Sequence, residues 1–462
     1  MLLLASILFE LSWLPFTLEN GATPEKHLVE TMPGGIAVFD YNGDGKVDIF
    51  FTNGAALPAG KKFPNRLFRN DGGMKFTDVT KEAGLEGEGY SMGAAVGDFD
   101  GDGHLDLFVA GMFANRLYRN LGDGRFADVT AKAGIRSDEW GVAGAWLDAD
   151  GDGLLDLLVV NYGKIDLTRP RACGEGKRVY CNPKYYPPRP NQFYRNKGGG
   201  VFELTKSLDA WPGRGMSVAV FDYDVDGKLD AFVTNDGLPN SLFRNLGGGK
   251  FEETALVAGV ALLDHGQAVA SMGVDFDGEN LIVSALSGET FPLFRKQGKA
   301  GFVDRTSLSQ LGRLSNRYAG WAILFADFDN DGHRDIFTAN SHVDDTLPNY
   351  KQPNTVFRSL GDGKFEAVEA GLAKSVSAHR GAAVADFDGD GLLDVVVSRI
   401  GEPAELWRNV TPDAGVYRSV PVKKIGESVT VEGKTQVFSP SAGYASSMFV
   451  PLHFGLGKKP VQ

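Results

Sequence analysis

A nine-residue motif that returns along the chain constrains its fold more than any other feature. Its clearest copy spans residues 98–106 and reads Asp-Phe-Asp-Gly-Asp-Gly-His-Leu-Asp. Acidic residues stand at positions 1, 3, 5 and 9, and glycine stands at position 6. Alternating acids allow carboxylate oxygens to converge on one point, and the glycine permits the sharp turn that wraps the backbone around an ion. The spacing is therefore that of a calcium-binding loop.

Six copies of the motif keep the expected oxygen donors, and they start at residues 40, 98, 148, 222, 327 and 386. We expect the side chains at positions 1, 3, 5 and 9 and the backbone carbonyl at position 7 to bind one Ca²⁺ in each copy. Position 7 varies between lysine, histidine and leucine, which fits a residue that contributes only its carbonyl. The candidate ligands are Asp40, Asn42, Asp44, Lys46 and Asp48; Asp98, Asp100, Asp102, His104 and Asp106; Asp148, Asp150, Asp152, Leu154 and Asp156; Asp222, Asp224, Asp226, Lys228 and Asp230; Asp327, Asp329, Asp331, His333 and Asp335; and Asp386, Asp388, Asp390, Leu392 and Asp394.

A damaged copy starts at Asp275 and runs into the apolar residues 281–283 before the loop is complete. We expect no calcium in this copy. In the intact copies, ligand sets made only of oxygen disfavour zinc, and magnesium would take fewer protein ligands. The sequence therefore predicts about six Ca²⁺ ions with a structural role. The alternative is a series of Asp/Gly turns that bind no metal.

Short apolar segments flank the intact loops and have the composition of buried β-strands. Residues 35–39 and 142–147 precede two of the loops, and residues 49–52 and 157–160 follow them. Such segments are β-branched or aromatic and are bounded by glycine, as strands are. An EF-hand would need flanking helices and a glutamate at position 12, where this chain has Phe, Val or Thr. We therefore interpret each loop as the tip of a β-hairpin.

Two further strands follow each hairpin except the last, which is followed by one. The first carries the pattern Leu-Phe/Tyr-Arg-Asn, as in residues 66–70, and the second resembles Phe-x-Asp-Val-Thr, as in residues 76–80. Successive units start 50 to 74 residues apart. Four strands in each of seven units are the pattern of a propeller. The predicted fold is all-β, with a seven-bladed β-propeller of four-stranded blades over residues 20–409 and a small, incomplete C-terminal β domain over residues 410–462.

The closure of the ring is the open question in this prediction. The seventh unit has three strands, which end at Arg408, so the amino terminus should supply the fourth strand. Residues 1–14 do not match the pattern of a fourth strand, so either a divergent segment closes the ring or the chain starts inside the domain. The apolar residues 1–9 are too short to span a bilayer, and they also fit the core of a secretion signal. Residues 1–19 are therefore a signal peptide or a divergent first strand.

An up-and-down order of strands sorts the loops onto two rims of the ring. The calcium loops lie on one rim, the metal rim, and the connections between second and third strands lie on the other, the insertion rim. The longest insertions, residues 54–64, 162–190 and 341–353, are of the second kind. Cys173 and Cys181 lie in one of them, and we expect a disulfide between them. The alternative is a pair of unrelated thiols in a reducing compartment.

The formal charge of −12 has a local origin, because much of the acid lies in the calcium loops. No prominent basic cluster accompanies it, which argues against nucleic acid as a partner. No stretch beyond the amino terminus looks transmembrane. Calcium loops of this kind fill outside the cell more readily than in cytosol, so calcium and the expected disulfide both favour an extracellular, periplasmic or cell-surface location.

The repeated motif, followed by Leu-Phe/Tyr-Arg-Asn, resembles the FG-GAP/VCBS repeats of integrin-α-like propellers. Residues 425–431, 443–447 and 453–457 resemble the ASPIC/UnbV domain. The pairing is typical of proteins similar to cartilage acidic protein. The resemblance covers roughly residues 20–409 and 415–459. It implies an extracellular, calcium-stabilised scaffold for protein or glycan contacts, without established catalysis.

Few residues outside the loops suggest a second site, and no motif of a nucleophile or a phosphate loop is evident. His342, Asp344 and Asp345 lie together in a long loop, either as a functional patch or as a solvated polar loop. A second group near the cysteines either contacts a sugar or protein or packs the insertion onto the ring; it consists of Tyr180, Tyr185 and Tyr186.

We therefore carry three hypotheses for function. The first is a non-enzymatic, calcium-dependent propeller that mediates extracellular interaction with a protein or glycan. The second is a secreted polysaccharide-acting enzyme, a lyase or hydrolase, that uses the central channel or the insertion rim. The third is a purely structural accessory in a larger complex. A converging set of acids and bases on the insertion rim would favour the enzyme.

Overall fold

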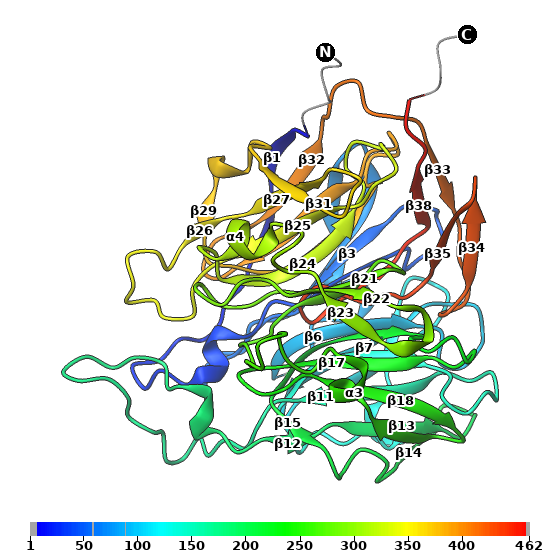
Figure 1. The fold of residues 1–462 in the computed structure, drawn as a ribbon. Helices are drawn as coiled ribbons and strands as arrows, with labels where there is room; N and C mark the ends of the chain where they lie inside the picture. The colour runs from blue at the N-terminus through cyan, green and yellow to red at the C-terminus, as the bar shows by residue number, and fades with distance from the viewer. Residues whose placement is uncertain (1–6, 58–59, 88, 459–462) are drawn as a thin grey trace.

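The computed structural model describes residues 7–57, 60–87 and 89–458, which form a ring of seven four-stranded antiparallel sheets (Figure 1). The innermost strand of each sheet contacts the innermost strands of its two neighbours, so the ring is closed. The predicted all-β fold and the seven-bladed propeller are confirmed. No helix in the described part of the chain is long and apolar enough to cross a bilayer.

The blades are numbered in chain order, and their strands are given from the innermost outward. Blades 1 and 2 contain β2 (Ile36–Phe39), β3 (Asp48–Phe51), β4 (Arg66–Gly72) and β5 (Lys75–Asp78), then β6 (Tyr90–Gly97), β7 (Asp106–Met112), β8 (Arg116–Asn120) and β9 (Phe126–Asp128). Blades 3 and 4 contain β10 (Gly141–Leu147), β11 (Asp156–Asn161), β13 (Gln192–Asn196) and β14 (Phe202–Leu204), then β16 (Gly215–Phe221), β17 (Asp230–Asn235), β18 (Ser241–Gly247) and β19 (Lys250–Glu253).

Blades 5 and 6 contain β20 (Val274–Phe276), β21 (Asn280–Val283), β22 (Leu293–Lys296) and β23 (Phe302–Asp304), then β24 (Gly320–Ala326), β25 (Asp335–Asn340), β27 (Thr355–Ser359) and β28 (Phe365–Val368). Blade 7 contains β30 (His379–Ala385), β31 (Asp394–Arg399), β32 (Pro403–Asn409) and β1 (Phe9–Thr17). Short helices connect some blades: α1 (Thr80–Ala83), α2 (Thr130–Ala133), α3 (Ala255–Ala258), α4 (Leu311–Ser315), η1 (Leu28–Thr31) and η4 (Leu372–Lys374). Two others lie within blades 3 and 5: η2 (Pro183–Tyr185) and η3 (Gly298–Ala300).

The ring closes through the amino terminus. Strand β1 pairs antiparallel with β32, with Phe9 opposite Asn409 and Leu14 opposite Ala404. The sequence of β1 lacks the Phe-x-Asp-Val-Thr pattern, but Phe9, Leu14 and Phe16 are buried and hold the strand against the ring. A divergent segment therefore provides the fourth strand of blade 7. Residues 1–6, most of the apolar run that also fits a secretion signal, lie outside the described residues.

The hydrophobic core lies between the faces of adjacent blades. Phe39 and Phe50 of blade 1, for example, are fully buried in one cluster with Val96 and Leu107 of blade 2. Neighbouring inner strands approach one another closely. A Cβ atom on Gly93, the fourth residue of β6, would lie 2.4 Å from the carbonyl oxygen of Val142 in β10, which explains the glycine at this position.

The C-terminal segment enters the central channel instead of standing apart from the ring. Strands β36 (Ser441–Ala442) and β37 (Ser446–Phe449) join the sheet of blade 1, where β37 runs parallel to β2. The backbone N–H of Val274 in blade 5 donates to the Gly443 carbonyl at 2.9 Å. Tyr444 is fully buried, and its hydroxyl donates to the Met32 carbonyl at 2.8 Å. The extra C-terminal strands therefore link blades across the ring.

The remaining C-terminal strands form two antiparallel pairs on the metal rim, at the right of Figure 1. The pairs are β33 (Tyr417–Val420) with β38 (Leu452–Gly455), and β34 (Ser428–Val431) with β35 (Lys434–Val437). The insertions gather at the left of the same view. They carry the short pairs β12 (Arg189–Pro190) with β15 (Pro212–Gly213) and β26 (Gln352–Pro353) with β29 (Val376–Ser377). The disulfide between Cys173 and Cys181 is confirmed.

Candidate metal centres on one rim

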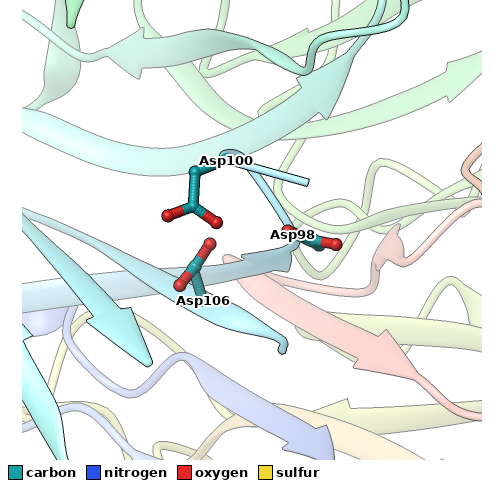
Figure 2. Close-up of side chains that lie close together, drawn as sticks. All are labelled: Asp98, Asp100 and Asp106. Atoms are coloured by element: carbon teal, nitrogen blue, oxygen red, sulfur yellow. The ribbon is translucent and has the colours of Figure 1, made fainter. Parts of the chain in front are cut away.

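The six intact loops join the first and second strands of blades 1–4, 6 and 7. Figure 2 shows the loop of blade 2, where side chains of Asp98, Asp100 and Asp106 face a common point. Loop N–H groups orient these acids: Gly101 and Gly103 donate to the two carboxylate oxygens of Asp98 at 2.8 and 2.9 Å. The glycines are needed because Gly101 and Gly103 adopt φ of 75° and 90°.

Carboxylate oxygens converge in five of the loops. In each, three aspartates offer one oxygen apiece, and these oxygens lie within 4.8 Å of one another. In the first loop Asn42 stands at position 3, and no such trio of acids is found there among the described residues. The converging sets are Asp98, Asp100 and Asp106; Asp148, Asp150 and Asp152; Asp222, Asp224 and Asp230; Asp327, Asp329 and Asp335; and Asp386, Asp388 and Asp394.

The aspartate at position 9 is buried in every intact loop. Asp106 begins β7, and its carboxylate accepts the backbone N–H groups of Phe99 at 3.0 Å and Asn120 at 2.8 Å. Burial, together with the nearby charges of Asp100 and Asp98, raises the pKa of Asp106 to about 8 despite these donors. The same two backbone bonds recur at the other position-9 acids, Asp48, Asp156, Asp230, Asp335 and Asp394. Each loop therefore holds a carboxylate that needs a proton or a cation.

The metal-free protein should accordingly lose stability as the pH rises. An acid whose pKa is higher in the folded state contributes stability that is complete below its unfolded pKa and is lost as the pH passes its folded pKa. Burial raises the pKa of Asp48, Asp156 and Asp230 to about 7, and that of Asp106 and Asp394 to about 8. In chelator, we expect the melting temperature to fall by several degrees between about pH 5 and about pH 8.

Calorimetric scans at several pH values measure this effect, with calcium-saturated protein as the control. Calcium should abolish the fall, because it keeps the same carboxylates ionised. A melting temperature that rises with pH in chelator would contradict the expectation.

The arginine of the Leu-Phe/Tyr-Arg-Asn motif faces several loops. Arg119 forms ion pairs with Asp100 at 2.5 Å and Asp102 at 2.9 Å. Arg195, Arg244 and Arg408 occupy the same place beside Asp150, Asp224 and Asp388. These guanidinium groups offset part of the negative charge of four loops. The sequence repeats the arginine, but strand periodicity alone does not reveal which acid it meets.

The asparagine of the same motif links neighbouring loops. The side-chain N–H₂ of Asn120 donates to Leu105 in its own loop at 3.1 Å and to Tyr41 in the loop of blade 1 at 2.9 Å. Equivalent bonds to a neighbouring loop run from Asn70 to Phe387, from Asn196 to Phe99 and from Asn409 to Phe328. Sequence reasoning assigned these residues only to strands. Their side chains in fact tie the loops together around much of the ring.

Blade 5, which carries the damaged copy, departs from this pattern. Asp275 lies inside β20, where its carboxylate accepts the backbone N–H of Phe325 in blade 6 at 2.7 Å. Asp277 caps the shortened turn by accepting the N–H of Asn280. Lys296 replaces the asparagine, and its ammonium donates to the Asp222 carbonyl of blade 4 at 2.9 Å. The Lys296 ammonium thus places a positive charge beside the calcium loop of blade 4. It comes from blade 5, where we expect no calcium.

The loop of blade 6 is covered by the C-terminal segment. The Lys434 ammonium donates to the Gly332 carbonyl at 2.9 Å, and a ring nitrogen of His453 lies 2.6 Å from the Asn330 side-chain oxygen. Asp327, Asp329 and Asp335 are all buried. The position-7 residue is exposed in the loops of blades 1, 2 and 6, where it is Lys46, His104 and His333.

The histidine and tyrosine groups singled out from the sequence lie on the insertion rim. His342 and Asp344 line a cavity of about 200 Å³ beside Trp321 and Tyr162, whereas Asp345 forms an ion pair with Lys26. Burial lowers the pKa of His342. Asp236 also lines this cavity; it accepts the Tyr162 hydroxyl at 2.7 Å, and burial raises its pKa to about 6.

The three tyrosines divide between packing and exposure. Tyr186 is buried, with its ring centroid 6.0 Å from that of Trp140, so it packs the insertion onto the ring. Tyr180 is half-buried, and the Lys26 ammonium lies 4.9 Å from its ring centroid. Tyr185 is 43% exposed. Of the three, Tyr185 is the most exposed.

A family model described as FG-GAP-like repeat matches residues 40–109, 99–159 and 339–397, which include loops of blades 1, 2, 3 and 7. The chain carries FG-GAP-like repeats. The acidic loops of these four blades are thus part of the matched repeats.

Curated proteins with similar sequences carry the name cartilage acidic protein 1. The chain is 27% identical over 265 residues to the protein of Mus musculus, a match that covers 53% of this chain and 40% of that protein. It is 28% identical over 265 residues to the protein of Homo sapiens, which covers 53% and 39%. The chain thus spans about two fifths of the length of the curated relatives it matches.

Among solved structures, BBS1N in complex with ARL6DN has a similar fold. The TM-score is 0.50 at 10% sequence identity, and the match covers 89% of this chain and 98% of that chain. At this identity the similarity concerns the fold alone.

Proposed function

We propose that the protein is an extracellular calcium-binding scaffold that mediates interaction with a protein or glycan and has no catalytic role. The observation that carries the proposal is the convergence of carboxylate oxygens in five loops on one rim. Hard oxygen donors in this number suit Ca²⁺. In all six loops, positions 1, 3, 5 and 9 would supply side-chain oxygens, and position 7 would supply its carbonyl.

The role of calcium in this proposal is structural. The position-9 aspartates accept backbone bonds from the third strand of their own blade, as Asp106 does from Asn120. The asparagine side chains then connect one loop to the next. An ion that neutralises one loop therefore stabilises the hairpin, the blade and the contact with the neighbouring blade. The opposite rim, with its long insertions, remains free to contact partners.

Three observations support the proposed extracellular location. A disulfide persists in oxidising compartments, and Cys173 and Cys181 form one. Extracellular calcium reaches millimolar levels, which fill sites of modest affinity. Similarity to cartilage acidic protein 1 supports the same location, in a secreted or cell-surface setting.

Removal of one loop acid should remove one site. We expect Asp98→Asn to lower the calcium stoichiometry of the protein by one, from about six, because position 1 contributes a charged ligand and organises the loop. Isothermal titration calorimetry of chelator-treated protein measures the stoichiometry. Asp123→Asn is the matched control, since Asp123 lies in the neighbouring glycine turn and pairs only with Arg125. An unchanged stoichiometry in Asp98→Asn, or an equal loss in the control, would refute the assignment.

A second candidate function is a polysaccharide-acting enzyme on the insertion rim. The cavity that Asp236 and His342 line favours it, because a buried carboxyl with a raised pKa is a common general acid. Incubation with neutral and acidic polysaccharides, followed by an assay for new reducing or unsaturated ends, separates the two candidates. Product formation that Asp236→Asn abolishes would establish the enzyme and overturn the scaffold.

A further inference from the structure

The insertion of blade 3 differs in charge from the rest of the molecule. Residues 162–190 contain seven lysine or arginine residues and two acidic ones, a formal charge of +5 in a chain that carries −12. The positive residues are spread along the sequence and do not form a run. Six of their side chains are exposed in the structure: Lys164, Arg169, Arg171, Lys177, Arg178 and Lys184.

The insertion is held in one shape at several points. The disulfide between Cys173 and Cys181 closes its outer part, and Tyr186 anchors its base against Trp140. The Arg178 guanidinium donates to the Glu25 carbonyl at 3.1 Å, which fixes the insertion to the segment that precedes η1. A binding surface on this segment would therefore be preorganised, which lowers the entropic cost of association.

A cavity of about 260 Å³ lies between the insertion and the segment before η1. Lys26, Lys164, Arg169 and Arg171 contribute positive charge to its lining, and Asp166 is the one carboxylate among its described lining residues. The Arg171 guanidinium lies 4.4 Å from the ring centroid of Tyr185, which also lines the cavity. The lining thus combines guanidinium groups with an exposed aromatic ring.

Several of these cations form no ion pair among the described residues. They are Lys164, Arg169 and Arg171, whereas exposed arginines elsewhere, such as Arg125 and Arg136, pair with Asp123 and Asp138. Unpaired guanidinium groups attract carboxylate or sulfate and bind such groups through two parallel hydrogen bonds. The cavity is therefore complementary to an anion.

We propose that the insertion binds an anionic polysaccharide, whose sugar rings carry carboxylate or sulfate groups. One acidic sugar unit occupies the cavity, where Arg169 and Arg171 bind its charged group and Tyr185 packs against the ring. The exposed Lys177, Arg178 and Lys184 extend the positive surface, so they meet further charges along a linear chain. This inference rests on the proposed extracellular scaffold and assigns its ligand class and its binding rim.

A polysaccharide fits these observations better than nucleic acid or an acidic protein. The positive surface is one insertion on an acidic molecule, so it lacks the broad basic face that nucleic acid binding needs. A folded protein partner would call for a larger apolar centre, whereas the cations here line a small cavity and an exposed loop.

Binding to three immobilised or labelled polymers tests the inference: heparin for sulfate, polygalacturonate for carboxylate, and dextran as the neutral control. All measurements use calcium-saturated protein. We expect binding to heparin, to polygalacturonate or to both, with no binding to dextran. The ratio of the two affinities identifies the charged group. Binding should weaken as salt rises, because the contacts release counterions.

The triple variant Lys164→Glu, Arg169→Glu and Arg171→Glu should weaken binding by about tenfold or more, since three charge-assisted contacts become repulsive. The matched control is Lys81→Glu, Lys132→Glu and Lys299→Glu, which changes the net charge equally at exposed sites outside the insertion. The control should bind as the wild type does. Thermal unfolding of both variants verifies that they fold.

Equal losses in both variants would show that binding depends on overall charge, and this would overturn the site. No binding to either acidic polymer, or preferential binding to DNA or to an acidic protein, would also overturn it. Such a failure is distinct from a failure of the calcium scaffold, because the calcium stoichiometry is measured without any polymer.

Discussion

We expect chelation of calcium to lower the melting temperature of the protein by roughly 15 °C, which is the largest of the expected effects. An ion present at a hundred times its dissociation constant adds about 2.7 kcal/mol when it binds only the folded state, so six such ions add about 16 kcal/mol. A chain of this length loses about 1 kcal/mol of stability for each degree near its melting point. Differential scanning calorimetry in calcium and in chelator measures the shift.

Two controls make this result specific. Magnesium at the same concentration should restore only a small part of the shift, because it demands a tighter, octahedral set of oxygens. The variant Asp98→Asn should show a smaller difference between calcium and chelator than Asp123→Asn does. If the melting temperature were the same in calcium and in chelator, the structural role of the ions would be wrong.

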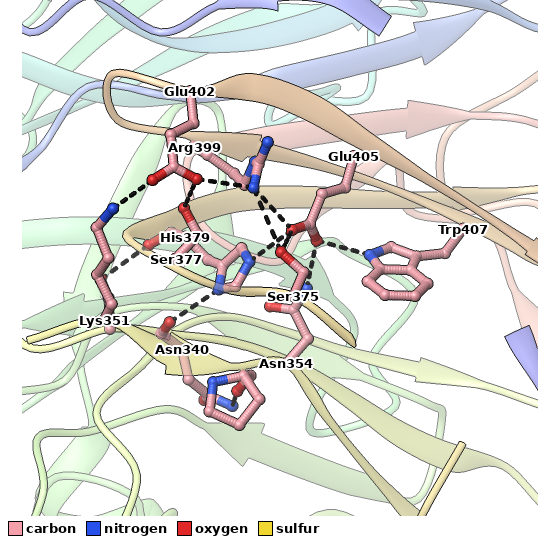
Figure 3. A network of polar contacts seen from close by, with 12 residues as sticks. Asn340, Lys351, Asn354, Ser375, Ser377, His379, Arg399, Glu402, Glu405 and Trp407 are labelled. Atoms are coloured by element: carbon pink, nitrogen blue, oxygen red, sulfur yellow. Dashed lines mark hydrogen bonds and ion pairs between the residues drawn. The ribbon is translucent and has the colours of Figure 1, made fainter. Parts of the chain in front are cut away.

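The second large effect concerns a buried charge between blades 6 and 7. Figure 3 shows Glu405 of β32 at the centre of a polar network. Its carboxylate lies 2.9 Å from a ring nitrogen of His379 and 3.4 Å from Arg399, and it accepts a bond from Trp407 at 2.6 Å. Glu405 and His379 are fully buried. The same carboxylate accepts the side-chain N–H₂ of Asn354, directly before β27 of blade 6, at 2.8 Å, so the network connects the closing blade to its neighbour.

We expect Glu405→Gln to destabilise the protein by about 3 kcal/mol, because it leaves buried cationic partners without their counterion. Denaturant unfolding in saturating calcium measures the change. Glu279→Gln is the control: Glu279 is largely exposed and pairs with Arg295 at 3.4 Å, so its loss should cost less than about 0.5 kcal/mol. Equal stabilities of the two variants would contradict the importance of the network.

Glu405 also makes the stability of the folded protein depend on pH in the acidic range. Burial alone would raise the pKa of Glu405, but the charge of His379 and hydrogen bonds from His379, Ser375 and Trp407 outweigh it and hold the pKa at about 2. A lowered pKa contributes stability that is present above the unfolded pKa of about 4.5 and is lost as the pH falls toward 2. Glu405→Gln should remove this part of the acid dependence.

The repeated motif made the blades predictable from sequence. Asp98 to Asp106 sets the loop, its apolar flanks set two strands, and Leu-Phe/Tyr-Arg-Asn sets the third. These signals are local. Because they recur in seven units, the strands can be predicted even where one copy of the pattern would be ambiguous. The buried position-9 aspartates follow from the same pattern, because each stands at the first residue of a second strand.

Features that depend on contacts between distant residues were not predictable in this way. Strand β1 has no repeat pattern, and only its pairing with β32 identifies it. The place of Tyr444 in the channel depends on a tight fit among inner strands that no periodicity reports. The link from Asn120 to Tyr41 crosses between blades, so it appears only once the ring is assembled. The positive charges of the insertion are spaced along the chain and meet only in the folded loop.

The pairing of β1 with β32 has a consequence for biosynthesis. Ser12 and Leu406, which form one hydrogen bond of this pair, are separated by 394 residues. At 5 to 20 residues per second, the first strand leaves the ribosome roughly 20 to 80 s before its partner exists. The segment that enters the channel is made later still. Until then the nascent chain has an open ring of blades and an empty central channel. During this interval it depends most on chaperones to prevent misassembly with other chains.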